Sequence, residues 1–134
     1  MPTFRGFEEI VAWQRAKRLA REVYRLSGTG AFGRDFALRD QIRRSAISAM
    51  SNIAEGFERD GSREFLQFLA IAKGSVGELR SHLYLAVDQK FLSERDFLRL
   101  FELSKETSRT IAGLMKYLRA SSLRGGRFRS ELET

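Results

Sequence analysis

The sequence predicts an all-α protein, an antiparallel up-down-up-down four-helix bundle with a C-terminal tail, and three observations carry this prediction. Apolar residues recur at spacings of three and four along most of the 134 residues, as on one face of a helix. The alternating pattern of β-strands is absent from the sequence. The one proline is Pro2, so no later segment is interrupted by proline. Long helices joined by short connections pack as antiparallel neighbours.

The first two helices are expected at about residues 7–26 and 35–58. The first carries the apolar stripe Ala12, Ala16, Leu19, Val23 and Leu26, and the second carries Leu38, Ile42, Ala46, Ala49, Ile53 and Phe57. The segment 27–30 ends the first helix, because its glycines readily take the left-handed conformation of a C-terminal cap. A connector over residues 31–34 follows, with Phe32 packed against the bundle.

The third and fourth helices are expected at about residues 63–89 and 94–119. Their stripes are Phe65, Phe68, Leu69, Ala72, Val76, Leu79, Leu83 and Ala86, and then Phe97, Phe101, Ser104, Ser108, Ile111, Met115 and Leu118. Asp60 or Ser62 is expected to cap the third helix and Ser93 the fourth. Residues 121–134 contain two adjacent glycines and no apolar periodicity. We therefore expect a bundle domain over residues 1–120 and a basic, flexible tail over 121–134.

Small and polar residues lie along the sides of the second and third helices that are expected to face each other. Two glycines inside the third helix need a reason, because glycine there costs about 1 kcal/mol relative to alanine. Close backbone approach, with serine and asparagine hydrogen-bonded across the contact, is the favoured explanation. A pocket lined by Asn52, Glu55 and Ser75 is the alternative, and a buried Glu55 would need a partner such as Arg44. The residues assigned to this seam are Gln41, Arg44, Ser48, Asn52, Glu55, Gly56, Gly74, Ser75, Gly77 and Glu78.

The N-terminal part of the third helix is apolar around more than half of its circumference. A helix of this kind is buried on more than one side, and in so small a domain a second copy of the chain is the natural cover. We therefore expect a homo-oligomer. The candidate interface residues are Phe65, Leu66, Phe68 and Ile71.

The chain is strongly basic, with a net charge of +7 and a pI near 10.4. This charge favours anionic partners, RNA or DNA first, which bind through phosphate contacts and counterion release. A solvated arginine-rich surface with no such role is the alternative. The candidate nucleic-acid-binding residues are Arg15, Lys17, Arg18, Arg21 and Arg25 in the first helix and Arg119, Arg124, Arg127 and Arg129 at the C-terminal end.

Other classes of function find no support in the sequence. The chain has no cysteine, and its one histidine, His82, lies four residues after Glu78 rather than in the Glu-x-x-His spacing of di-iron bundles. No catalytic motif, cofactor site, metal site or small-molecule site is indicated. No apolar run approaches the roughly 20 residues of a membrane span, and the N-terminus does not read as a secretory signal. We expect a cytoplasmic protein that is not an enzyme and has no membrane partner.

Several short blocks resemble one bacterial family. They are QIRRSAIS at 41–48, SNIAEG at 51–56, Arg59, Ser62, Glu64-Phe65, Gly74-Ser75 and Glu78-Leu79, preceded by Phe7 and VAWQRA at 11–16. Together they resemble the four-helix-bundle proteins encoded by 23S rRNA-intervening sequences, over about residues 7–118. The chain departs from the family pattern at Ala49-Met50 and in its tail.

The resemblance implies a left-handed bundle that assembles as a ring-like homopentamer. It also implies kinship with the accessory variability determinant of diversity-generating retroelements, a basic pentamer that binds a reverse transcriptase and nucleic acid. Most members of the family have no assigned biochemical function. We therefore expect a non-enzymatic oligomeric scaffold that binds RNA or DNA. The alternative is a protein–protein adaptor, for example to a reverse transcriptase, with no direct role in nucleic-acid binding.

Overall fold

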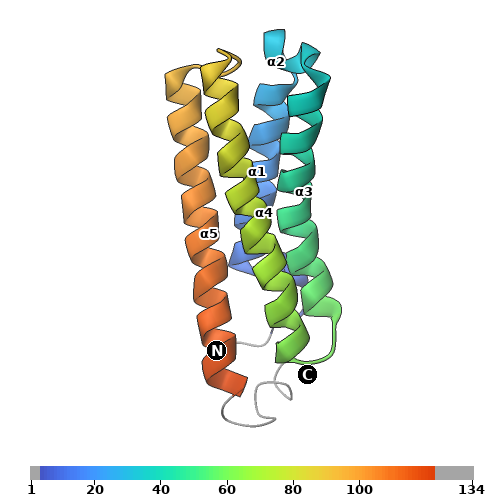
Figure 1. Ribbon diagram of the computed structural model, residues 1–134. Helices are drawn as coiled ribbons and strands as arrows, with labels where there is room; N and C mark the ends of the chain where they lie inside the picture. The colour runs from blue at the N-terminus through green and yellow to red at the C-terminus, as the bar shows by residue number, and fades with distance from the viewer. Residues whose placement is uncertain (1–3, 123–134) are drawn as a thin grey trace.

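The computed structural model describes residues 4–122, and this part of the chain is built from helices and short connections (Figure 1). A short 3-10 helix, η1 (Phe7–Glu9), precedes α1 (Val11–Ser27), and α2 (Gly30–Arg34) is a single short turn. The long helices α3 (Phe36–Glu58), α4 (Ser62–Asp88) and α5 (Glu94–Ser122) follow. No strand occurs among these described residues, so the predicted all-α class is confirmed.

The four long helices run alternately up and down, as the colours in Figure 1 show. Each packs against two others: α3 and α5 both contact α1, and both contact α4. The longest helices, of 27 and 29 residues, extend roughly 40 Å at the usual rise per residue. This arrangement leaves elongated surfaces between neighbouring helices along the whole length of the bundle.

The core consists of the predicted apolar stripes. Most of their positions are buried, and Phe32 is also buried, as expected. Small core residues such as Ala16, Ala46 and Ala72 let the helices approach closely, while leucine and isoleucine fill the space between them. Burying these side chains is the main source of stability for helices whose individual propensities are unremarkable.

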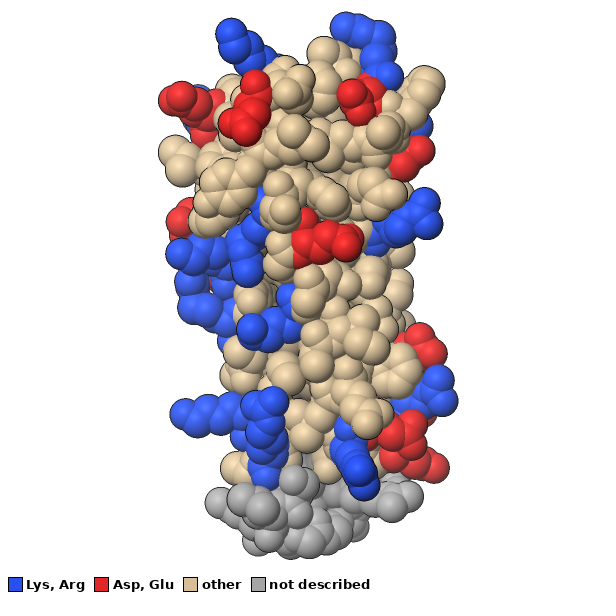
Figure 2. Space-filling view, viewed as in Figure 1, with Lys and Arg blue, Asp and Glu red and all other residues tan. Residues whose placement is uncertain are grey.

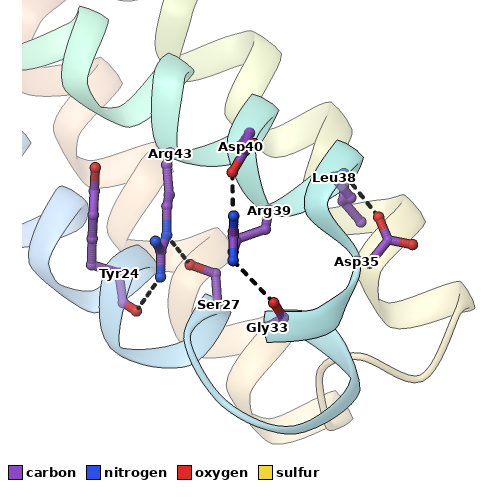
Figure 3. Close-up of polar contacts among 8 residues, drawn as sticks. All are labelled: Tyr24, Ser27, Gly33, Asp35, Leu38, Arg39, Asp40 and Arg43. Carbon is purple, nitrogen blue, oxygen red and sulfur yellow. Dashed lines mark hydrogen bonds and ion pairs between the residues drawn. The ribbon is translucent and has the colours of Figure 1, made fainter.

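Hydrogen bonds fix the corner where α1, α2 and α3 meet (Figure 3). Arg43 of α3 donates to Ser27 Oγ at 2.8 Å and to the carbonyl of Tyr24 at 3.3 Å, and its guanidinium lies 4.3 Å from the centre of the Tyr24 ring. Arg39 donates to the carbonyl of Gly33 at 3.1 Å, and Asp35 Oδ1 caps α3 by accepting from the amide of Leu38. The last carbonyls of α1 and α2 therefore find partners on α3.

The ends of three elements differ from the prediction. The first helix begins at Val11 rather than residue 7, because Ile10 is extended and buried and Phe7 packs on Trp13 with ring centroids 5.1 Å apart. The expected connector over 31–34 is the short helix α2. Helix α5 continues to Ser122, so residues 121–122 belong to it, and the remainder of the expected tail lies outside the described residues.

The predicted cap of the third helix is also wrong. Neither Asp60 nor Ser62 caps α4; Gly61 occupies the N-cap position with φ of +94°, a conformation that side chains other than hydrogen strongly disfavour. Ser93 does cap α5 as predicted, since its Oγ accepts from the amide of Asp96 at 3.0 Å. In the part of the chain from 4 to 122, no helix is long and apolar enough to cross a lipid bilayer.

Candidate nucleic-acid interface

The predicted basic face of α1 is present but partly neutralised. Arg15 forms an ion pair with Glu106 of α5 at 3.2 Å, and it also donates to Thr110. Arg25 pairs with Glu22 at 3.1 Å. Two of the five cations are thus engaged by acids of the bundle itself, which lowers their capacity to attract a phosphate backbone.

The other three cations of this face, Lys17, Arg18 and Arg21, are exposed. Lys17 places its ammonium 5.4 Å from the centre of the Trp13 ring. Arg119 is an exposed residue near the end of α5, and Arg124, Arg127 and Arg129 lie outside the described residues. The structure therefore brings together only the α1 members of the candidate set.

Glu22 is the centre of a small charged cluster between α1 and α5. Its carboxylate accepts from Arg25 and lies 2.6 Å from Arg99 of α5. The hydrogen bond from Arg25, with the positive charges of Arg25, Arg99 and Arg18, holds the pKa of Glu22 below its ordinary value of 4.5. This cluster links α1 to α5. Its arginines are therefore engaged in contacts within the bundle and are less available to bind a ligand.

A second basic surface, which sequence reasoning missed, lies in a groove between α4 and α5. The groove has a volume of about 300 Å³, and it is lined by Lys73, Arg80, Phe101, Lys105, Ser108, Arg109 and Ala112. Figure 2 shows lysine and arginine side chains gathered at mid-height over these two helices, on the left of the view. Four cations and one hydroxyl thus converge on one concave surface, which we call the α4–α5 groove.

The cations of the α4–α5 groove have no acidic partners within the part of the chain that the structure describes. None of the four forms an ion pair there, in contrast to Arg15 and Arg25 on α1. Arg80 is the cation whose hydrogen bonding is least satisfied. Its Nη1 atom is buried and has no hydrogen-bond partner among the described residues. A buried N–H left without an acceptor costs about 1–3 kcal/mol, and the Arg80 guanidinium would recover this cost only by turning toward an acceptor in the groove.

The sequence contains a weak signal for the groove, which is the helical spacing of its basic residues rather than a dense run of charge. Lys73 and Arg80 are seven residues apart, and Lys105 and Arg109 are four apart, so each pair lies on one helix face. Neither pair forms a dense run. Only the antiparallel packing of α4 on α5 places the two faces opposite each other.

The predicted polar seam between α3 and α4 is present at three of its residues. The hydroxyls of Ser48 and Ser75 are hydrogen-bonded at 2.8 Å, and Asn52 Nδ2 donates to the carbonyl and the hydroxyl of Ser48. Ser75 Oγ also lies 3.1 Å from the carbonyl of Ile71. The Ser48–Ser75 bond joins the two helices, and the bonds of Asn52 and Ser75 within their own helices complete the set, which is a structural role.

The glycines of the seam behave differently from the prediction. Gly56 is the close-approach position, since a Cβ there would lie 2.6 Å from Cβ of Phe68 and 3.1 Å from the ring of Phe65. Gly74 is exposed, and a Cβ added there would meet nothing within 4 Å; at Gly77 a Cβ would meet only the Arg80 guanidinium at 3.8 Å. The expectation that Gly74 and Gly77 permit close packing within the bundle is therefore wrong, because both face away from α3.

The charged members of the assigned seam, and Gln41, lie on the surface. Gln41 and Arg44 are exposed, and Glu55 is exposed and pairs with Arg59 at 3.1 Å rather than with Arg44. Glu78 is exposed, with its Oε1 3.8 Å from His82 Nε2. Among residues 4–122, no group of three or more histidine, aspartate and glutamate side chains is placed to hold a metal ion.

The candidate interface residues of α4 differ in how far they are exposed. Phe65 is 1% exposed and belongs to the core, so its assignment to an interface is wrong. Leu66 and Phe68 are half-buried, and Phe68 lies 5.1 Å beneath the Arg59 guanidinium. Ile71 is 52% exposed. Of these four side chains, only Ile71 offers a largely open apolar surface.

Comparison with known proteins agrees with this fold. The model of the family described as "23S rRNA-intervening sequence protein" matches residues 8–113. A crystal structure from Bacteroides thetaiotaomicron VPI-5482, titled as a protein with unknown function from the S23 ribosomal protein family, is similar with a TM-score of 0.73. It shares 21% sequence identity, and the match covers 79% of this chain and 96% of that one, which shows a shared fold. No curated protein matches the chain.

Proposed function

The chain belongs to the 23S rRNA-intervening sequence protein family, and from this premise we propose that it is a non-enzymatic helical scaffold that binds nucleic acid. The observation that carries the proposal is the α4–α5 groove, where Lys73, Arg80, Lys105 and Arg109 converge without an acidic partner among the described residues. Like charges held this close repel one another, so the folded protein gains stability when an anion neutralises them.

A phosphate backbone suits this groove better than a small carboxylate ligand does. Arginine offers planar, bidentate N–H donors to phosphate oxygens, and lysine and Ser108 add further donors. The groove lies between two helices of more than 25 residues each, so a chain of phosphates bound in it has room to continue along the bundle. The exposed Lys17, Arg18 and Arg21 on α1 lie outside the groove and contribute to the general positive field.

Salt dependence tests this function directly. The protein is expected to bind structured RNA at about 50 mM salt and to lose affinity steeply towards about 300 mM, because each phosphate contact releases bound counterions. The triple variant Arg80→Gln, Lys105→Gln, Arg109→Gln is expected to bind at least about tenfold more weakly at low salt. Its slope of log affinity against log salt should be shallower by about 2 to 3, since each lost contact removes about 0.7–0.9. Fluorescence anisotropy measures both quantities.

A matched control removes the same charge from the other basic face. Lys17→Gln, Arg18→Gln, Arg21→Gln leaves the α4–α5 groove intact, and it is expected to change affinity by less than about threefold. An equal loss in the two variants would show that only net charge matters and would reject the groove as the site. Binding no tighter than micromolar for the unmodified protein at the lowest salt would reject the function itself.

We also propose that copies of the chain associate through the outer face of α4. This outer face comprises the exposed residues Ala70, Ile71, Gly74, Ser81 and Leu85. Apart from the exposed Glu78, its residues are small or apolar, whereas the surface of a helix that faces only water is usually charged. Gly74, which nothing within the bundle explains, suits a close contact with a second helix.

A further inference from the structure

An exposed aromatic cluster continues the α4–α5 groove toward the connection between these two helices. The ring of Tyr84 lies 5.3 Å from that of Phe97 and 5.6 Å from that of Phe101, measured between centroids. Phe101 also lines the groove, and the ammonium of Lys105 lies 5.7 Å from the centre of its ring. Aromatic and basic side chains therefore form one continuous surface.

Tyr84 is the member of this cluster that is open to a ligand. Tyr84 is 54% exposed. This is a large exposed fraction for a residue with an apolar aromatic ring. Phe97 is tilted by 59° and Phe101 by 77° relative to it, so among the described residues no ring stacks in parallel on Tyr84. Phe97 and Phe101 stack on each other with an angle of 29° between their ring planes. Both rings contact Tyr84 and hold it in place.

The spacing of aromatic and basic residues is the same on both helices. Tyr84 follows Arg80 by four residues on α4, and Lys105 follows Phe101 by four residues on α5. Four residues rise about 6 Å along a helix, and the two helices are antiparallel, so the aromatic side chains gather at one end and the cations at the other. A ligand with planar groups next to charged groups fits this order.

We infer that the groove takes single-stranded nucleic acid, with an unpaired base stacked on Tyr84 and the adjoining phosphates held by Arg80, Lys105 and their neighbours. This inference rests on the proposed function and names its substrate class. A duplex keeps both faces of its bases covered by stacking, and it therefore has no face to offer the tyrosine, whereas a single strand turns its bases outward. The cations alone would bind both forms.

Two substitutions at Tyr84 distinguish the contribution of base stacking from that of apolar side-chain volume. Tyr84→Leu keeps an apolar side chain and removes the ring, and it is expected to weaken binding of a mixed-sequence single strand of about 12 nucleotides at least about fivefold. Tyr84→Phe keeps the ring and is expected to stay within about twofold. Neither variant should change binding of a duplex of the same sequence. A fluorescent adenine analogue in the single strand should be quenched by the unmodified protein and by Tyr84→Phe, and less by Tyr84→Leu.

The outcomes distinguish this inference from the function on which it rests. Single-strand affinity that is unchanged in Tyr84→Leu, with its helical circular dichroism intact, would overturn the stacking role. Duplex binding as tight as single-strand binding would do the same while leaving nucleic-acid binding in place. If neither form binds at low salt, the proposed function fails and the inference fails with it. Ile47→Ala, an exposed apolar change on α3 outside both the groove and the outer face of α4, is the control and should leave both affinities unaltered.

Discussion

At the scale of single residues, two glycines in neighbouring helices have opposite surroundings. Gly56 lies where α3 and α4 come closest, and Phe68 and Phe65 occupy the space that a side chain would need. Gly74 lies on open surface near the middle of α4. A glycine inside a helix lowers stability unless close packing requires it, so the two positions should respond to alanine with opposite signs.

Gly56→Ala is expected to lower the free energy of unfolding by about 1–3 kcal/mol, because Cβ of Phe68 cannot move away without shifting its helix. Gly74→Ala is expected to raise it by about 0.5–1 kcal/mol in the protomer, since alanine reduces the freedom of the unfolded chain. Urea unfolding followed by circular dichroism measures both. If Gly56→Ala is neutral, the backbones of α3 and α4 are not in close contact there.

At the scale of elements, the cluster around Glu22 links α1 to α5. Glu22 and Arg25 belong to α1 and Arg99 to α5, so one carboxylate serves two arginines on different helices. The arginines hold the pKa of Glu22 below that of the unfolded chain. A carboxyl whose pKa is lowered by folding stabilises the native state above its unfolded pKa, and the contribution disappears as the pH falls through the folded pKa.

Glu22→Gln is therefore expected to destabilise the protein at about pH 7, and the difference from the unmodified protein should shrink steadily below about pH 4. Thermal unfolding across this range measures the difference. Glu102→Gln is the matched control, because Glu102 is an exposed acid of α5 that forms no ion pair with any residue from 4 to 122. A pH-independent effect of Glu22→Gln would show that the arginines do not favour its charged form.

At the scale of the whole molecule, charge and apolar surface are separated around the bundle. The α4–α5 groove carries cations without acidic partners in the described chain, whereas the outer face of α4 beside it is small and apolar. If copies associate through that outer face, one oligomer carries one α4–α5 groove for each of its protomers. Repeated weak sites on one nucleic acid raise the overall affinity well beyond that of one groove.

Ile71→Glu is expected to disperse the assembly at micromolar concentration, because a charge at the centre of an apolar contact loses its hydration without gaining a partner. Ile47→Glu is the matched control: Ile47 is 43% exposed on α3, outside the outer face of α4, and its change should leave the oligomer intact. Sedimentation velocity distinguishes the two, and it also measures the ring size, for which the expectation is a pentamer. An unmodified protein that sediments as a monomer would contradict the assembly.

The number, order and approximate limits of the long helices follow from the amino-acid sequence alone. The expected helices 35–58 and 63–89 correspond to Phe36–Glu58 and Ser62–Asp88, because apolar periodicity is a local property of the chain. The sequence also predicts most of the core, and the seam residues Ser48, Asn52 and Ser75, since the period of 3.6 fixes which residues share a face.

Which helix faces meet depends on how the four helices pack together. The rotation of each helix about its axis placed Gly56 against Phe68, left Gly74 on the surface and buried Phe65. It also brought Arg15 to Glu106 and Arg99 to Glu22 across the contact of α1 with α5. The same rotation brought two sparse pairs of cations from α4 and α5 into one groove, although neither pair stands out along the chain. Contacts between segments about 30 residues apart depend on how every side chain of the core packs at once, and no local pattern encodes that.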